Sequence, residues 1–200
     1  MLMRTLGRTA ACFFLLASVS DAQSPRVAGI GPLVEGGLGY TYVSMDFPST
    51  SRVGMNGLDA NITADFLGTL GVRADLGYAR ASNVFNSGHH SDVLSYLAGP
   101  VFYPFRRKRL IVCVDLLVGG ARVTGVTPNS AGEQFEGFAN KLAWAYGVGF
   151  QYSVSPSLGI RFDTNVFHTA YFNSSAAVQG QENLRTMINV VWYFGKRKEP

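Results

Sequence analysis

Two histidine-containing segments hold the side chains best suited to chemistry, and the first is a possible metal site. His89 and His90 are adjacent, and Asp92 lies close by. Adjacent histidines on a loop lack the spacing that directs two ligands at one ion while a third partner is fixed. We therefore expect a solvated loop, with no metal and no cofactor. The sequence also lacks a phosphate-binding glycine loop, a zinc pattern and a dinucleotide fingerprint.

His168 is the second candidate, as the base of a nucleophile–base–acid set. By the alternation described below it faces outward, near one end of a predicted strand. The segment His168-Thr169-Ala170 offers no serine, and the nearest partners are Ser174 and Glu182. Three groups would have to converge for catalysis, and only the histidine is well placed. We predict that the protein is not an enzyme and that His168 meets lipid headgroups, with a hydrolase as the alternative.

The elements that position these residues are strands with two unlike faces. In residues 58–66 every even position is apolar and every odd position is Asp, Asn or Thr. In residues 142–152 large apolar residues alternate with Ala, Gly and Gln. Period-two alternation of this kind is typical of a β-strand. Because glycine and alanine cannot form a packed core whereas large aromatics can meet lipid, we expect the apolar face to point outward, as in a transmembrane barrel.

Alternation and turn residues together predict eight strands, at 33–44, 56–66, 70–81, 92–103, 110–123, 140–152, 158–171 and 183–194. Each is long enough to cross a bilayer at a tilt, which takes ~9–11 residues. Short turns at 67–69, 104–109 and 153–157 alternate with longer loops at 45–55, 82–91, 124–139 and 173–182. This asymmetry is typical of bacterial outer-membrane barrels, whose short turns lie in the periplasm. The fold class is therefore all-β, an eight-stranded antiparallel transmembrane β-barrel with longer extracellular loops. Near 92–103 and 110–123 both faces carry apolar residues, so alternation leaves their orientation open.

The chain divides into four parts. Residues 1–22 carry the features of an export signal: Arg4 and Arg8, then an apolar run, then small residues in Ser20-Asp21-Ala22. We expect cleavage after Ala22, a linker at 23–32, the barrel at 33–194 and a basic tail at 195–200. Cleavage would leave Cys113 as the one cysteine, which excludes an internal disulfide.

The inward faces are predicted to form a polar network that fills the lumen, made of Glu35, Asp59, Asp65, Arg73, Asp75, Asp115, Arg161, Asp163 and Arg185. Thr63 would lie opposite Arg73, with Asp65 diagonal to it. The interior of an eight-stranded barrel is just wide enough for side chains, whereas general porins need ~16–18 strands. We expect a plugged lumen, and a narrow gated pore is the alternative.

Aromatic residues at strand ends predict two membrane interfaces. Tyr42, Tyr78 and Trp144 fall near the outer interface, and Tyr152, Trp192 and Phe194 fall near the periplasmic one. Basic residues cluster at 106–109 and 196–198, on the periplasmic side of the predicted strands. They are not interleaved with aromatics, so we interpret them as charges that flank the membrane and meet anionic headgroups, rather than as a nucleic-acid site.

From residue 34 to residue 194 the chain resembles the small OmpA-like, eight-stranded outer-membrane β-barrel family. The resemblance rests on Gly57-Leu58-Asp59-Ala60, residues 70–78, Leu97-Ala98-Gly99-Pro100 and Asn183-Leu184-Arg185. Barrels of this family often end at an aromatic residue, whereas here six residues follow Phe194.

The resemblance implies a monomer in the bacterial outer membrane, in contact with its lipid, its lipopolysaccharide and its assembly machinery. We expect a structural role in the envelope or a surface-interaction role through the extracellular loops, whose ligands the sequence does not name. Three alternatives stay open: the narrow pore, a lipid A deacylase-like barrel enzyme, and a soluble lipocalin-like barrel whose faces would be inverted.

Overall fold

The computed structural model describes residues 33–46, 52–84, 88–107, 109–128, 134–169 and 181–195. The predicted signal peptide and linker lie outside the described residues, as does the basic tail beyond Gly195. The strands are β1 (Leu33–Met45), β2 (Val53–Asp65), β3 (Leu70–Ala81), β4 (Ser91–Arg107), β5 (Leu110–Pro128), β6 (Gln134–Ser153), β7 (Leu158–Thr169) and β8 (Gln181–Phe194). No helix of the described residues is long and apolar enough to cross a membrane.

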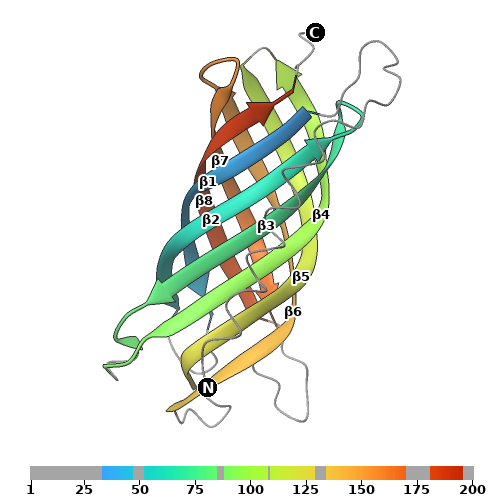
Figure 1. The fold of residues 1–200 in the computed structure, drawn as a ribbon. Helices are drawn as coiled ribbons and strands as arrows, with labels where there is room; N and C mark the ends of the chain where they lie inside the picture. Colours follow the sequence, from blue (N-terminus) through green and yellow to red (C-terminus); the bar gives the residue numbers. More distant parts are fainter. Residues whose placement is uncertain are drawn as a thin grey trace, which may run out of the picture. The chain divides into compact units, whose positions relative to one another are not determined.

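The eight strands form one closed antiparallel barrel in sequence order, as predicted (Figure 1). Each strand pairs with the next, and β8 returns to pair with β1 from Val34↔Phe194 to Ser44↔Leu184. Closure leaves no free sheet edge around the barrel wall, so the backbone hydrogen bonds of the wall are satisfied within the protein.

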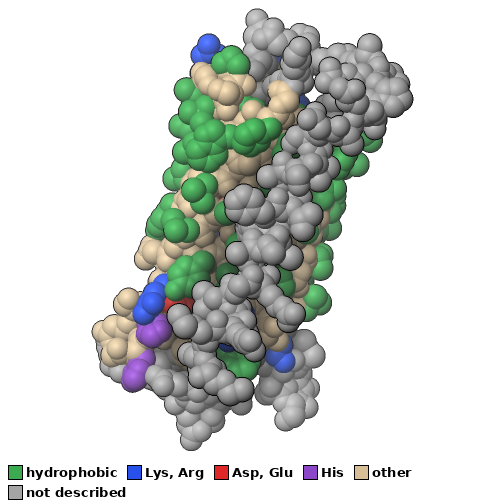
Figure 2. Space-filling model, viewed as in Figure 1, with side chains coloured by type: hydrophobic (Ala, Val, Ile, Leu, Met, Phe, Trp, Pro, Cys, Tyr) green, Lys and Arg blue, Asp and Glu red, His purple; other side chains and the backbone are tan. Residues whose placement is uncertain are grey.

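The barrel is inside-out, with apolar side chains on its exterior. Along β3, exposed and buried residues alternate at every position from Leu70 to Ala81. Leu58 and Ile62 of β2 are exposed, whereas Asp59 and Thr63, the residues that follow them, are buried in the lumen. Figure 2 shows hydrophobic side chains distributed over the outer wall. A soluble lipocalin-like barrel requires the opposite orientation, so that alternative does not fit.

The structure also orients the two strands whose faces the sequence left open. In β4, Ser95 and Leu97 face the lumen while Tyr96 faces outward. In β5, Cys113 and Asp115 face the lumen. Apolar lumen residues such as Leu97 explain why alternation of polarity was lost in these strands.

The predicted loop at 124–139 is wrong, because most of it is strand. Pairing of β5 with β6 continues past Val123↔Ala139 to Pro128↔Gln134. Among the described residues, β6 pairs with β7 only from Ala143↔Thr169 onward, so the start of β6 is paired with β5 alone. Figure 1 shows this β5–β6 hairpin reaching past the neighbouring strands. Residues that favour turns can remain extended when two segments form hydrogen bonds between their backbone N–H and C=O groups.

The predicted turn at 104–109 is also too long. β4 continues to Arg107, which pairs with Leu110, and the register shifts between Phe102 and Phe105. Pro104 lies within this register shift, and bulges are positions at which a strand tolerates proline, which has no N–H to donate to the ladder. The connection shrinks to residues 108 and 109.

Inward-facing glycines allow neighbouring strands to approach one another. A Cβ atom built on Gly39 of β1 would lie 1.9 Å from the carbonyl oxygen of Ile188 on β8. A Cβ on Gly36, which faces outward, would lie 3.4 Å from a ring carbon of Phe194, an ordinary contact. Glycine is thus required at position 39 and optional at position 36.

Replacing these two glycines with alanine tests this account. Gly39→Ala should destabilise the barrel by about 1–3 kcal/mol, because the backbone of β1 or β8 must shift. Gly36→Ala should leave stability unchanged. The measurement is the fraction of refolded protein that migrates as the compact form on unboiled gels across a urea series. Equal midpoints for the two variants would contradict the account.

Candidate functional site

Arg73 forms the centre of an ion-pair network that crosses the lumen. Its Nη1 atom lies 2.6 Å from Oδ2 of Asp115 on β5 and 3.3 Å from Oδ1 of Asp163 on β7. Its Nε donates a hydrogen bond of 3.3 Å to Thr63, which lies directly opposite on β2, as predicted. Asp115 also accepts a 2.7 Å hydrogen bond from Asn165. One arginine therefore connects strands on opposite sides of the barrel.

Arg161 extends the network toward the periplasmic end. Its Nε donates a 2.8 Å hydrogen bond to Asp163, and its guanidinium also donates to Asn61 of β2. Its Nη1 lies 3.8 Å from Glu35 of β1. Glu35 in turn accepts a 3.2 Å hydrogen bond from Gln151 of β6.

Arg185 extends the network toward the extracellular end. Its Nη1 donates hydrogen bonds of 2.7 Å to Asp75 and 3.4 Å to the hydroxyl of Ser95. The guanidinium also lies over the ring of Phe167, 5.6 Å from its centroid. Asp59, nearby on β2, accepts a 2.8 Å hydrogen bond from Asn61.

The structure buries all nine residues of the predicted lumen set inside the barrel. Asp65 has a partner that the sequence did not suggest: it forms an ion pair with Arg106 of β4. Arg106 had been interpreted as part of a headgroup cluster, and the structure corrects this, since its guanidinium also lies 3.7 Å from the centre of the Tyr103 ring. The pair joins the ends of β2 and β4, whose residues 65 and 106 are 41 positions apart in the sequence.

An apolar cluster fills the extracellular half of the lumen, which the sequence analysis did not predict. It includes Val43, Met45, Met55, Leu97, Leu117, Val123, Ala143 and Phe167. The signal was present in the sequence. Inward positions are charged at the middle of the strands, but become apolar toward the extracellular end, as at Val43 and Met45 of β1.

The described lumen is filled with buried side chains along its length. Arg73, Arg161 and Arg185 each expose 1% of their surface, and Met45, Met55 and Leu117 expose none. Side chains that line an aqueous channel would be accessible to water. The arrangement is a charged network capped by an apolar layer, which matches the filled interior expected for eight strands.

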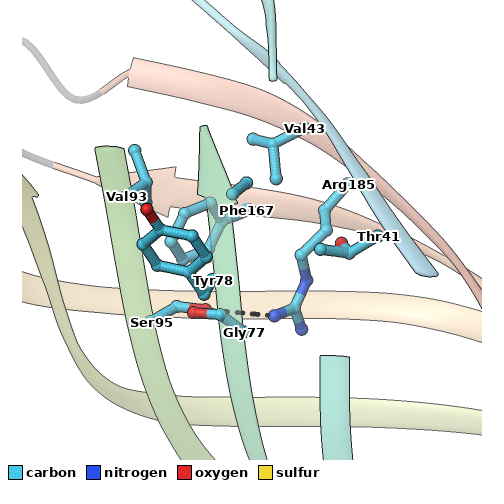
Figure 3. Close-up of a pocket in the computed structure, with 9 residues that line it drawn as sticks. Thr41, Val43, Gly77, Tyr78, Val93, Ser95, Phe167 and Arg185 are labelled. Atoms are coloured by element: carbon cyan, nitrogen blue, oxygen red, sulfur yellow. Dashed lines mark hydrogen bonds between the residues drawn. The ribbon is translucent and has the colours of Figure 1, made fainter. Parts of the chain in front are cut away.

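One small cavity lies between the apolar layer and the charged network (Figure 3). Thr41, Ser95 and Arg185 line it together with Val43 and Phe167. The volume of this cavity, about 10 Å³, is enough for one water molecule and too small for a metabolite.

His168 lies in an outward aromatic cluster near the extracellular interface. Its ring stacks on Trp144 with centroids 4.9 Å apart, and Trp144 stacks on Tyr146 at 5.5 Å. Glu182 of β8 is its partner in register, so histidine and acid do lie on neighbouring strands. The remaining candidate, Ser174, is outside the described residues.

In the described part of the chain, the His89-His90 segment contacts Asp92 through the side chain of His90. Nε2 of His90 lies 3.6 Å from Oδ2 of Asp92, an exposed contact between two side chains. Among residues that the structure describes, no group of three or more His, Cys, Asp and Glu side chains could hold a metal ion.

The six predicted interface aromatics all lie on the outer wall. Tyr42, Tyr78, Tyr152, Trp192 and Phe194 are exposed, and Trp144 is half-buried by its stacking partners. Tyr42, Tyr78 and Trp144 occupy the extracellular half, and the other three occupy periplasmic strand ends. This distribution matches the two aromatic girdles of outer-membrane barrels.

Solved structures with the same fold are bacterial outer-membrane proteins. Ail, the attachment invasion locus protein of Yersinia pestis, is 17% identical, with a TM-score of 0.57 over 82% of this chain and 100% of Ail. Neisserial surface protein A is 10% identical, with a TM-score of 0.57 over 82% and 98% of the two chains. OprG from Pseudomonas aeruginosa is 15% identical, with a TM-score of 0.51 over 83% and 97%. No family model and no curated protein matches the sequence.

These similarities, at low identity, define the fold. Together with the apolar outer wall and the two aromatic girdles, they identify the chain as an outer-membrane β-barrel of the bacterial cell.

The ion-pair network can be tested at Arg73. Arg73→Met should destabilise the barrel by about 3–5 kcal/mol, because Asp115 would remain charged, buried and without its arginine. Combining Arg73→Met with Asp115→Leu should recover most of this loss, since no unpaired charge then remains at position 115. Arg107→Met, at an exposed residue of the same type, should change stability by less than ~0.5 kcal/mol. Urea unfolding in detergent micelles measures all three, and a double variant no better than Arg73→Met would refute the assignment.

Proposed function

We propose that this protein is a monomeric, non-conducting and non-enzymatic barrel with a structural or surface-interaction role in the outer membrane. The single observation that carries the proposal is the filled lumen. Its three central arginines are 1% exposed, and an apolar layer covers them on the extracellular side. Such an interior stabilises the wall and leaves no path for a solute, which argues against the narrow pore.

The β5–β6 hairpin is the feature best suited to surface interaction. Phe138 and Leu142 on it are 71% and 70% exposed, and Arg122 lies over the Phe138 ring at 4.9 Å. Rigid scaffolds commonly carry their binding residues on projecting connections. A surface role has precedent on this fold, because Ail has also been crystallised with the heparin analogue sucrose octasulfate.

The enzyme alternative finds little support in the geometry. The outward neighbours of His168 in the described strands include Trp144, Val166 and Leu184, which carry no nucleophile. Position 170, two residues after His168, is alanine, which also carries no nucleophile. The proposal further includes removal of residues 1–22 on export, membership of the OmpA-like family, and contact with lipid, lipopolysaccharide and the assembly machinery that recognises such barrels.

The absence of conductance is the direct test of the filled lumen. Purified protein inserted in a planar bilayer should give no stepwise current, because no continuous water path crosses the charged network. A general porin inserted under the same conditions provides the positive control. Discrete, reproducible current steps from the folded protein would favour the gated pore instead.

Deleting the gene tests the proposed role in the cell. The deletion should increase sensitivity to detergent or reduce retention of cells on heparin-coated beads, and the wild-type gene should restore both. A gene carrying Phe138→Ser and Leu142→Ser should restore detergent resistance but not retention if the hairpin makes the contact. A deletion strain with unchanged resistance and unchanged retention would count against both roles.

A further inference from the structure

A basic patch faces outward at the extracellular end of β3, β4 and β5. We call it the rim patch and define it as Arg80, His90, Asp92, Arg122 and Phe138. Figure 2 shows basic and histidine side chains gathered near one acidic side chain at this end of the barrel. None of these residues takes part in the lumen network, and the proposed role of the hairpin leaves the two arginines unexplained.

The register fixes how the two arginines lie. Arg80 of β3 is paired with Asp92 of β4, and Leu94 of β4 is paired with Arg122 of β5. The arginines therefore stand two strands apart and two residues apart along the strands, which is roughly 12 Å between their Cα atoms at the usual strand spacing and rise. Both are on the outer wall, with exposed side chains.

The rim patch has more positive than negative charge. Nε of Arg80 lies 3.5 Å from Oδ1 of Asp92, yet 48% of the Arg80 side chain stays exposed. Among the side chains that the structure describes, Arg122 has no acidic partner, and its contact is the face of Phe138. Each guanidinium thus presents unused N–H donors to its surroundings, in the fork geometry that suits phosphate.

The position of the rim patch along the barrel axis favours lipid as its ligand. From Leu70 to Tyr78 the outward residues of β3 are apolar or aromatic, and Arg80 is the next outward residue. Nine residues at ~3.3 Å each and a tilt of ~40° span about 23 Å, close to the ~25 Å apolar band of such barrels. Tyr78 and Tyr96 are exposed at the end of this band. Arg80 therefore lies where lipid headgroups begin, and its side chain is directed at the bilayer.

We propose that the rim patch binds the phosphate groups of lipid A, the phosphorylated saccharolipid of the outer leaflet, with one phosphate on each arginine. The inference rests on the proposed membrane orientation and adds a specific ligand to it. A disaccharide with a phosphate at each end matches two separated arginines better than a single phosphodiester does. Asp92 aligns Arg80 and at the same time competes with phosphate for it.

The experiment compares lipid binding by native mass spectrometry of the folded protein in detergent. The probes are diphosphoryl lipid A, monophosphoryl lipid A and dimyristoyl phosphatidylglycerol. The wild type should retain diphosphoryl lipid A most strongly. Arg80→Gln with Arg122→Gln should lower its affinity by about tenfold or more, as two charge-assisted contacts are lost. Asp92→Asn should raise it by a few-fold.

The matched control is Arg107→Gln at the periplasmic end, where the arginine also lies over a phenylalanine ring, at 5.8 Å from Phe105. It should keep the wild type's preference for diphosphoryl over monophosphoryl lipid A. Equal affinity of the wild type and the double variant, both compact on unboiled gels, would overturn the lipid site while leaving the barrel assignment intact. Full displacement of lipid A by dextran sulfate would assign the patch to a soluble sulfated ligand instead. If the double variant does not fold, the single variants and Asp92→Asn decide the question.

Discussion

The lumen of an eight-stranded barrel is just wide enough for side chains to fill, so a charge placed there needs a protein partner. This constraint governs the interior of the molecule. Arg73 satisfies it with Asp115 and Asp163, and Arg161 and Arg185 satisfy it on either side. Because each arginine contacts carboxylates on other strands, the network holds opposite walls at a fixed distance. An isolated charge at any of these positions would cost several kcal/mol.

The same constraint explains why the polarity of the lumen side chains changes along the barrel. Toward the extracellular end the lumen changes from charged to apolar, and Met45 and Met55 pack there with no accessible surface. Close strand approach at Gly39 keeps the wall tight around this filling. A barrel built in this way is a rigid support. Variation in function is then confined to what projects beyond the wall and to the lipid-facing surface.

These two outer regions meet at β5. Arg122 belongs to the rim patch through its position beside Leu94, and to the β5–β6 hairpin through its contact with Phe138. The proposed surface contact and the proposed lipid contact therefore share one structural element.

Apart from the ends of β4, β5 and β6 and the faces of β4 and β5, strand positions and face directions followed from the sequence, because side-chain direction alternates with the backbone of a single strand. The aspartates of β2 were assigned to the lumen on this ground, and all nine predicted lumen residues are buried. Partner choice was decided only in three dimensions. The Asp65–Arg106 pair, the extension of β5 and β6 beyond the predicted loop, and the orientation of β4 each depend on a neighbouring strand. Local alternation carries no information about which strand supplies the opposite charge, since closure of the barrel sets that distance.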